Sequence, residues 1–179
     1  MNIRKFYSKE FISLLLQHLV VLLIGFTIFI LEEYQHLPNR VNLIILLGVA
    51  AVKATYFTLA NFKNIYNVRV RDKSFNHFLT LTGTNILLIV ISFGLDYYCI
   101  NKIVPSSISG LTSTNSAKQF LECLYFSIMT FSTTGFGDVT PKNLYTRGLV
   151  AMEIIVAFTA TVFVIANYAN YAKADKNPR

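Results

Sequence analysis

A short segment in the C-terminal half of the chain, Thr133–Asp138 (TTGFGD), holds the residues most able to do chemistry. Its two glycines, Gly135 and Gly137, flank an aromatic residue, and a carboxylate follows. Glycine adopts left-handed backbone without a Cβ penalty but weakens a helix, so the segment predicts an irregular loop. Such a loop leaves backbone carbonyl oxygens in need of a partner. The natural partner for a row of carbonyl oxygens is a cation.

Apolar sequence lies on both sides of this loop. The chain of 179 residues is 54% hydrophobic and 14% charged, with mean hydropathy +0.50, which is too apolar for an ordinary soluble domain of this length. About 20 apolar residues cross the ~30 Å hydrocarbon core of a bilayer. The runs that approach this length are Phe11–Leu31, Val41–Ala60, Phe78–Ile100 and Arg147–Tyr171. The sequence therefore predicts an all-α membrane protein with four transmembrane helices.

Lysine and arginine residues gather at the predicted membrane boundaries. One group precedes the first run, a second lies in the loop of residues 61–77, and a third follows the last run. With four spans these groups share one side of the membrane, and the excess of basic residues marks the cytoplasmic side. We expect a multi-pass plasma-membrane protein with both termini in the cytoplasm. The net charge of +7 is then explained by the membrane boundaries, and we expect no nucleic-acid partner.

The segment before the glycine loop, residues 116–132, predicts a short helix. Ser116 and Gln119 have the spacing of a capping box, and apolar residues then recur at three- and four-residue steps as far as Phe131. A helix over about 117–131 measures roughly 22 Å, which is too short to cross a bilayer. A short helix and a loop between the third and fourth spans indicate a re-entrant segment. Irregular backbone at membrane depth is tolerated only where protein buries it or where it lines a watery path.

The TTGFGD segment closely resembles the selectivity filter of potassium channels, whose usual form is TVGYGD. The flanking residues 124–138 (LYFSIMTFSTTGFGD) resemble the pore helix and filter of prokaryotic potassium channels and two-pore-domain channels. Residues 138–158 (DVTPKNLYTRGLVAMEIIVAF) resemble the filter exit and the start of the inner helix. The resemblance covers roughly residues 78–171, about half of the chain.

The apolar runs and the resemblance, which does not extend to the first two runs, together divide the chain into three parts. The N-terminal region, residues 1–77, has transmembrane helices at about 11–31 and 41–60 and a basic cytoplasmic loop. The pore domain, residues 78–171, has an outer helix at about 78–100, a pore helix at about 117–131, the filter at 133–138 and an inner helix at about 146–171. A short cytoplasmic tail, residues 172–179, follows.

The resemblance also implies a function, which is passive and potassium-selective conduction. A potassium ion sheds its water in such a filter, so the wall must supply replacement oxygens. The resemblance assigns K⁺ binding to the carbonyls of Thr133, Thr134, Gly135 and Phe136, with the Thr133 hydroxyl, and assigns Gly137 and Asp138 to the rest of the filter. One chain supplies one loop while the family ring needs four, so the implied assembly is a homotetramer. Its expected partners are membrane lipid, further copies of itself and K⁺ as the permeant ion, with no cofactor.

Residues of the predicted inner helix are assigned in the same way. By resemblance Phe158, Thr161 and Ile165 would face the cavity below the filter, and their spacing places them on one helical face.

The segment departs from the usual filter at two positions, which keeps other functions open. Thr134 replaces the usual valine and Phe136 the usual tyrosine, and Met129 falls where some prokaryotic members have a glutamate that supports the filter aspartate. A less selective cation channel of the same architecture is one alternative, and a non-conducting membrane interaction protein is another. An enzyme is not expected, because no Ser/His/Asp, Cys/His or metal-ligand constellation appears.

Several polar residues lie within or beside the predicted spans. Lys53 is expected to extend to the cytoplasmic interface, and Asp96 with Tyr97–Tyr98 to anchor the outer interface. Glu153, an intramembrane acid, has two open interpretations, a functional group or a structural hydrogen bond to the pore helix. His18 is expected to be a packed polar residue.

The segment of residues 101–115 is expected to be a short extracellular turret without chemistry of its own. Cys99 and Cys123 are expected to be unpaired thiols, with a disulfide between them as the lesser alternative.

Overall fold

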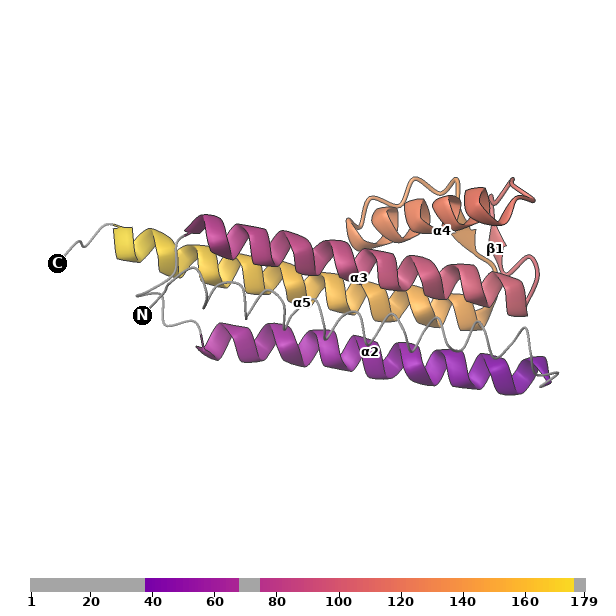
Figure 1. Ribbon diagram of the computed structural model, residues 1–179, viewed down its shortest axis with the longest axis horizontal. Coiled ribbons are helices and arrows are strands. Elements are labelled where there is room, and N and C mark those ends of the chain that lie inside the picture. The colour runs from indigo at the N-terminus through magenta and orange to yellow at the C-terminus, as the bar shows by residue number, and fades with distance from the viewer. Residues whose placement is uncertain (1–37, 68–74, 176–179) are drawn as a thin grey trace.

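The computed structural model describes residues 38–67 and 75–175, and Figure 1 shows their arrangement. The elements are α2 (Asn39–Asn67), α3 (Phe75–Ile103), β1 (Ile108–Ser109), α4 (Ser116–Phe131), β2 (Thr140–Pro141) and α5 (Leu144–Asp175). The predicted span Phe11–Leu31, with His18, lies outside the described residues.

The long helices α2, α3 and α5 pack side by side along most of their length (Figure 1). Each contains a segment long and apolar enough to cross a membrane, and these segments are Asn39–Leu59, Phe78–Ile103 and Leu144–Tyr168. The described part of the chain is thus mostly helical with three candidate spans, which agrees with the predicted class of membrane protein. The helices extend beyond the apolar runs, because polar residues such as those at the end of α5 continue a helix without contributing to hydropathy.

Asparagine side chains begin two of the helices. Asn115 is the N-cap of α4, and its side chain accepts hydrogen bonds from the backbone N–H groups of Ala117 and Lys118. The predicted capping box at Ser116 and Gln119 is therefore wrong by one residue, because the asparagine before Ser116 supplies the acceptor. Asn143 acts similarly before α5, where its side chain accepts a hydrogen bond from the N–H of Thr146.

The helix α4 and the segment that follows it form a hairpin at one end of the bundle. The helix packs against α3, and the chain then returns alongside α4 to the end from which it came (Figure 1). There β1 and β2 pair antiparallel, with Ile108 opposite Pro141 and Ser109 opposite Thr140. This short ladder forms the neck of the hairpin and leads directly into α5.

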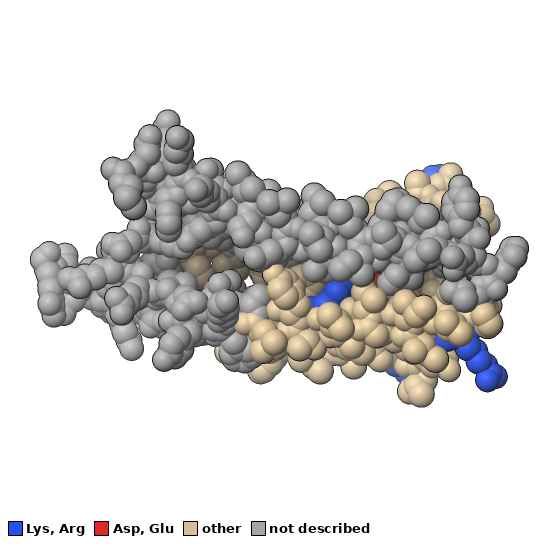
Figure 2. Space-filling model, turned by 60° about the horizontal axis from the view of Figure 1, so that its bottom comes forward, with Lys and Arg blue, Asp and Glu red and all other residues tan. Residues whose placement is uncertain are grey.

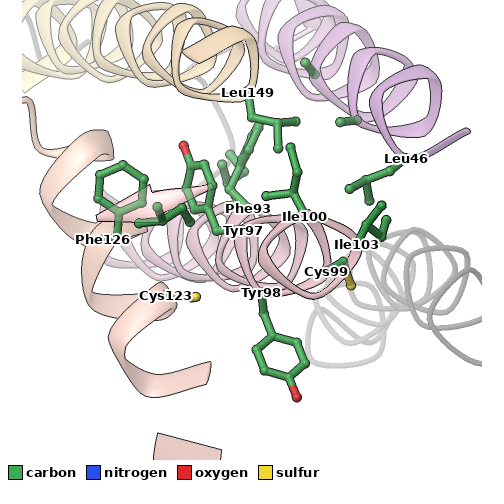
Figure 3. Close-up of a cluster of buried hydrophobic side chains, with 14 of the residues drawn as sticks. Leu46, Phe93, Tyr97, Tyr98, Cys99, Ile100, Ile103, Cys123, Phe126 and Leu149 are labelled. Carbon is green, nitrogen blue, oxygen red and sulfur yellow. The ribbon is translucent and has the colours of Figure 1, made fainter. Parts of the chain in front are cut away.

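One apolar cluster joins all of the described helices. Phe93, Tyr97 and Ile100 of α3 lie at its centre, and they meet Leu149 of α5 and Phe126 of α4 (Figure 3). The Tyr97 and Phe126 rings lie 4.7 Å apart between centroids, in a tilted arrangement. Between helices in a membrane, close packing of such large rings stabilises the bundle through van der Waals contacts and ring–ring geometry. This cluster fixes α4, and with it the loop that α4 carries, against α3 and α5.

Candidate functional site: the segment after α4

The glycine-containing segment leaves the end of α4 through a tight turn. The N–H of Thr133 donates to the Thr130 carbonyl at 3.0 Å, and the N–H of Thr134 donates to the Met129 carbonyl at 3.0 Å. The Ser132 and Thr134 hydroxyl oxygens lie 2.9 Å apart. These bonds fix the direction in which the chain turns back beside α4.

Every second residue of this segment has left-handed backbone. The φ angles are +55° at Thr133, +53° at Gly135 and +82° at Gly137. Left-handed backbone at the two glycines agrees with the expectation from sequence, whereas Thr133 adopts it despite its branched Cβ, which is an uncommon and costly conformation. Strained backbone of this kind persists where the surrounding structure determines it, and such positions cluster at functional sites.

The segment is uncovered in the single chain. Residues 132–138 are all exposed, and the Phe136 side chain is 70% exposed. A Cβ atom added to Gly135 or Gly137 would meet no atom within 4 Å. The described part of one chain therefore leaves this segment free to face other molecules.

A tyrosine of α4 holds the carboxylate at the outer end of the segment. The Tyr125 hydroxyl donates a hydrogen bond of 2.7 Å to Asp138 Oδ2. This bond is the main cause that lowers the pKa of Asp138 below its ordinary value, and it raises the pKa of Tyr125. Sequence reasoning missed Tyr125. The Tyr125 hydroxyl supports Asp138 in this structure. Met129, at the position where some family members have a supporting glutamate, has no polar group that could do so.

The segment predicted to be a turret without chemistry braces the same outer end. Gly110 has φ +90°, and a Cβ added there would lie 2.0 Å from the Asp138 carbonyl oxygen. The N–H of Lys142 donates to the Ser107 carbonyl at 2.9 Å. The turret therefore contacts the chain on both sides of Pro141, a structural contact that the sequence did not predict.

Glu122 of α4 is bound by the turret as well. Its Oε1 accepts a 2.7 Å hydrogen bond from the Thr112 hydroxyl, and its Oε2 accepts bonds from the N–H groups of Thr112 and Ser113. These bonds lower the pKa of Glu122, and the bond from the Thr112 hydroxyl has the largest effect.

Behind the segment, a buried carboxyl group connects α4 to α3 and α5. Glu153 is 0% exposed; its Oε2 accepts a 2.6 Å hydrogen bond from the Tyr97 hydroxyl, and its Oε1 lies 2.5 Å from Ser127 Oγ. Ser127 belongs to α4, so of the two interpretations of Glu153 the structure bears out the hydrogen bond to this helix. Thr130, one turn further along α4, also interacts with the Tyr97 hydroxyl.

A buried ion pair joins α2 to α3. The Lys53 ammonium lies 2.6 Å from both carboxylate oxygens of Asp96 and donates to Ser92 Oγ at 3.0 Å. Lys53 is 4% exposed and Asp96 is 1% exposed. The expectation that Lys53 extends to the interface is wrong, because a partner within the protein compensates its charge and removes the need to reach water.

Figure 2 shows one face of the molecule, on which the described surface consists mostly of uncharged residues and the basic side chains are few and lie apart.

The residues expected to anchor the outer interface are buried within the protein instead. Tyr97 and Tyr98 point to opposite sides of α3, and Tyr98 packs edge-on against Phe120 (Figure 3). Both tyrosines and Asp96 are buried, so their interpretation as interface anchors is wrong. Cys99 and Cys123 are buried free thiols. Among the side chains that the structure describes, no group of three or more His, Cys, Asp or Glu residues could hold a metal ion.

The residues assigned to a cavity lie on one exposed face of α5. Phe158 is 69% and Ile165 is 63% exposed, and Thr161 is exposed between them. The opposite face of α5, with Val156, is buried against the bundle. The single chain thus leaves this apolar face without a covering element among the described residues.

Comparison with known proteins places these elements in a family. Residues 85–174, about half of the chain, match the family described as "Ion channel", and this range contains most of α3, all of α4 and the filter-like segment, and α5 up to its penultimate residue. The helix α2 lies outside the match.

Individual relatives are potassium channels by name. The chain is 37% identical over 79 residues to "Two-pore potassium channel 4" of Arabidopsis thaliana, a match that covers 44% of this chain and 24% of that protein. It is 23% identical over 130 residues to "Potassium channel K2" of Plasmodium berghei, covering 73% and 9%. It is 30% identical over 66 residues to "Probable potassium channel protein 2" of Methanocaldococcus jannaschii, covering 37% and 19%.

The chain therefore spans at most about a quarter of the length of these relatives. No solved structure matches it. The family match covers most of α3, α4 with its glycine segment, and nearly all of α5, which are the same elements that the structure assembles around Glu153. The chain belongs to the ion channel family, and its relatives include potassium channels.

Proposed function

We propose that this protein is a potassium-selective channel that conducts K⁺ passively, with Thr133–Asp138 as its selectivity filter and four copies around one axis. The carbonyls of Thr133, Thr134, Gly135 and Phe136 hold the ions, with the Thr133 hydroxyl at the inner end. The protein supplies no chemical step. It replaces the hydration shell of the ion and lowers the barrier to crossing.

The observation that carries this proposal is the alternation of left-handed backbone at Thr133, Gly135 and Gly137. In a uniform strand, successive carbonyls point to opposite sides. Alternating left-handed and right-handed residues instead allow successive carbonyls to point to one side, as a ladder of cation ligands requires. The ordinary turn that a GD pair could form would not need this alternation over five residues.

The hairpin geometry supports a re-entrant placement in the membrane. The helix α4 has 16 residues and is roughly 24 Å long, so it enters a bilayer without crossing it. The hairpin formed by α4 and the segment after it begins and ends at the end of the bundle where α3 finishes and α5 starts (Figure 1). With the basic segments in the cytoplasm and Phe11–Leu31 as the first of four spans, the filter opens at the outer face of the plasma membrane.

The exposed surfaces of the single chain support a tetramer. A filter formed by one chain would leave its ions open to lipid or water on the other sides. Phe158, Thr161 and Ile165 form an exposed apolar face below the filter, which three further copies would enclose as a cavity.

The decisive experiment is a reversal-potential measurement. The purified protein is reconstituted in a bilayer with K⁺ on one side and Na⁺ on the other. We expect a reversal potential far from zero in the direction of K⁺ selectivity. A value near zero supports the less selective cation channel, and no conductance from correctly assembled protein supports a non-conducting interaction protein.

The tetramer is tested by Gly135→Ala. The φ of +53° penalises alanine, and an added Cβ would meet no atom of the same chain within 4 Å, so in the proposed tetramer it would crowd the filter or a neighbouring copy. If four loops form one filter, equal co-expression with wild type leaves roughly one assembly in sixteen intact, so current falls to about 6% at matched surface levels. Retention of about half the current would mean that chains conduct independently.

A further inference from the structure

The hydroxyl of Ser127 contacts two oxygen atoms but carries only one hydrogen. Ser127 Oγ lies 2.9 Å from the Val90 carbonyl oxygen of α3 and 2.5 Å from Glu153 Oε1 of α5. A serine hydroxyl donates one hydrogen bond and can accept others. The carbonyl of Val90 can only accept. If Ser127 donates to Val90, its contact with Glu153 is a hydrogen bond only when Glu153 is the donor.

The charges around Glu153 also favour its protonated form, in which it can donate a hydrogen bond. Its titratable neighbours are Tyr97, which donates to Oε2, and Asp96, which is close enough for a Coulomb interaction. From α4 it meets the uncharged Ser127. The nearby cation is Lys53, and that ammonium is fully engaged by both oxygens of Asp96 and by Ser92.

An ionised Glu153 would therefore be a buried anion beside a second anion, with no cation of its own among the described side chains. A carboxyl group in that position takes up a proton rather than bear the desolvation cost of a charge. The oxygen–oxygen distances suit either charge state, so the hydrogen count and the charge balance decide between them.

We propose that Glu153 is held as a neutral carboxylic acid and acts as a positioning residue for the filter. Its Oε1–H donates to Ser127 Oγ, Ser127 donates to the Val90 carbonyl, and Tyr97 donates to Glu153 Oε2. Every donor and acceptor in this chain is then satisfied. These hydrogen bonds connect α4 to both α3 and α5 through Ser127, which lies about one and a half helical turns before Thr133.

Ser127 and Thr130 together present the polar side of the last turns of α4 to this network. Movement of α4 relative to α3 or α5 would shift the filter that α4 carries, so the proposed role is to keep the filter in its conducting geometry. The role at the filter rests on the proposed function, whereas the protonation state does not. The two are therefore tested by separate measurements.

The protonation state is tested by infrared spectroscopy of the full-length protein in lipid at neutral pH. We expect the carbonyl stretch of a protonated carboxylic acid, which shifts when the protein contains isotope-labelled glutamate and disappears in Glu153→Gln. The matched control is Glu122→Gln at the exposed turret contact, which should remove only carboxylate absorption. If labelling shifts no acid band, or if Glu153→Gln removes carboxylate absorption instead, the proposal is wrong, whether or not the protein conducts.

The positioning role is tested by conductance and selectivity at matched amounts of assembled protein. An amide at residue 153 can still donate to Ser127 and accept from Tyr97, so Glu153→Gln should conduct within about twofold of wild type with an unchanged K⁺/Na⁺ permeability ratio. Glu153→Ala should lower both quantities, the conductance by about tenfold or more. Val156→Ala, which removes buried apolar volume from the same helix, should lower thermal stability but leave the permeability ratio unchanged.

Loss of conduction in an assembled Glu153→Gln protein would show that the charge is needed and would overturn the neutral-acid proposal. Equal permeability ratios in Glu153→Ala, Val156→Ala and wild type would overturn the positioning role.

Discussion

Two tyrosine–carboxyl hydrogen bonds of nearly the same length lie on opposite sides of α4. In the core, the Tyr97 hydroxyl donates to Glu153 at 2.6 Å, and at the outer rim the Tyr125 hydroxyl donates to Asp138 at 2.7 Å. Tyr97 and Glu153 are both fully buried, whereas Asp138 is exposed. Each contact joins a tyrosine hydroxyl to a carboxyl oxygen, so burial, together with the charge state that burial imposes on the carboxyl group, is the main difference between them.

Burial changes what each bond does for the molecule. At the rim, water replaces a lost partner at little cost, and an exposed carboxylate stays ionised. In the core, a lost partner leaves an unsatisfied polar atom in a medium that strengthens every electrostatic interaction. The core contacts are therefore expected to determine stability and assembly, and the rim contacts to adjust the local geometry and titration of the filter exit.

The largest effect is expected when a buried charge loses its partner. Lys53→Met leaves the Asp96 carboxylate unpaired in the core, and the expected loss of stability is about 3–5 kcal/mol. Thermal unfolding of the assembled protein in detergent measures this loss. Lys53→Met combined with Asp96→Asn removes both charges and should recover most of the stability. If the double variant is as unstable as the single one, the shape of Lys53 rather than its charge is what the core requires.

A second substitution tests whether the rim always tolerates change. Gly110→Ala places a methyl group against the Asp138 carbonyl oxygen and forces alanine to φ +90°, so a loss of about 2 kcal/mol or more is expected despite the exposed position. Conductance should fall with it, because the filter exit must move. Gly48→Ala is the control, since a Cβ there meets nothing within 4 Å and helical backbone suits alanine. A tolerant Gly110 would mean that the turret moves freely from the filter.

The two tyrosines provide the direct comparison. Tyr97→Phe leaves a buried carboxyl oxygen without its donor, so we expect about 1–3 kcal/mol lower stability. Tyr125→Phe should leave thermal stability unchanged, and it should make conduction decline sooner at low K⁺ because Asp138 loses its support. Both are measured on the same preparations, by thermal unfolding and by current decay. Equal losses of stability would remove burial as the explanation of the difference.

The smallest effect concerns pH at the rim. Bonds donated by Thr112 and Ser113 favour ionised Glu122 and lower its pKa, so their contribution to stability is complete above the ordinary pKa of glutamate. It is lost as the pH falls through the lowered pKa of the folded protein. Thermal unfolding between neutral and acidic pH should show a shallow decline, and Glu122→Gln should reduce its slope. A slope unchanged by Glu122→Gln would assign the decline to other carboxylates, with Asp138 first among them.

The short helix and its loop were predictable because local patterns specify them. The helix predicted over 117–131 is observed at Ser116–Phe131, and left-handed backbone was expected at Gly135 and Gly137 from residue type alone. The apolar runs predicted three of the helices for a similar reason, because spanning a membrane demands a run of fixed length.

Partners distant in the sequence were not predictable. Lys53 and Asp96 are 43 residues apart, and nothing in either local sequence indicates that two different helices bring them together. The same holds for Tyr125 and Asp138, and for Gly110, whose tight contact with the Asp138 carbonyl arises only after the hairpin closes. These contacts depend on how helices are rotated against each other, which periodicity leaves open. The identity of the residues that bind K⁺ stays a prediction.

The β1–β2 neck has a consequence for the order in which the protein is made. The neck joins Ser109 to Thr140, so it closes a loop of roughly 30 residues at a modest entropic cost, and α4 packs mainly against α3. Both steps are possible as soon as the ribosome has released Pro141. Glu153 emerges later, within α5. We therefore expect the hairpin to form first, and Tyr97 and Ser127 to gain their hydrogen bonds to Glu153 only when the last helix is inserted.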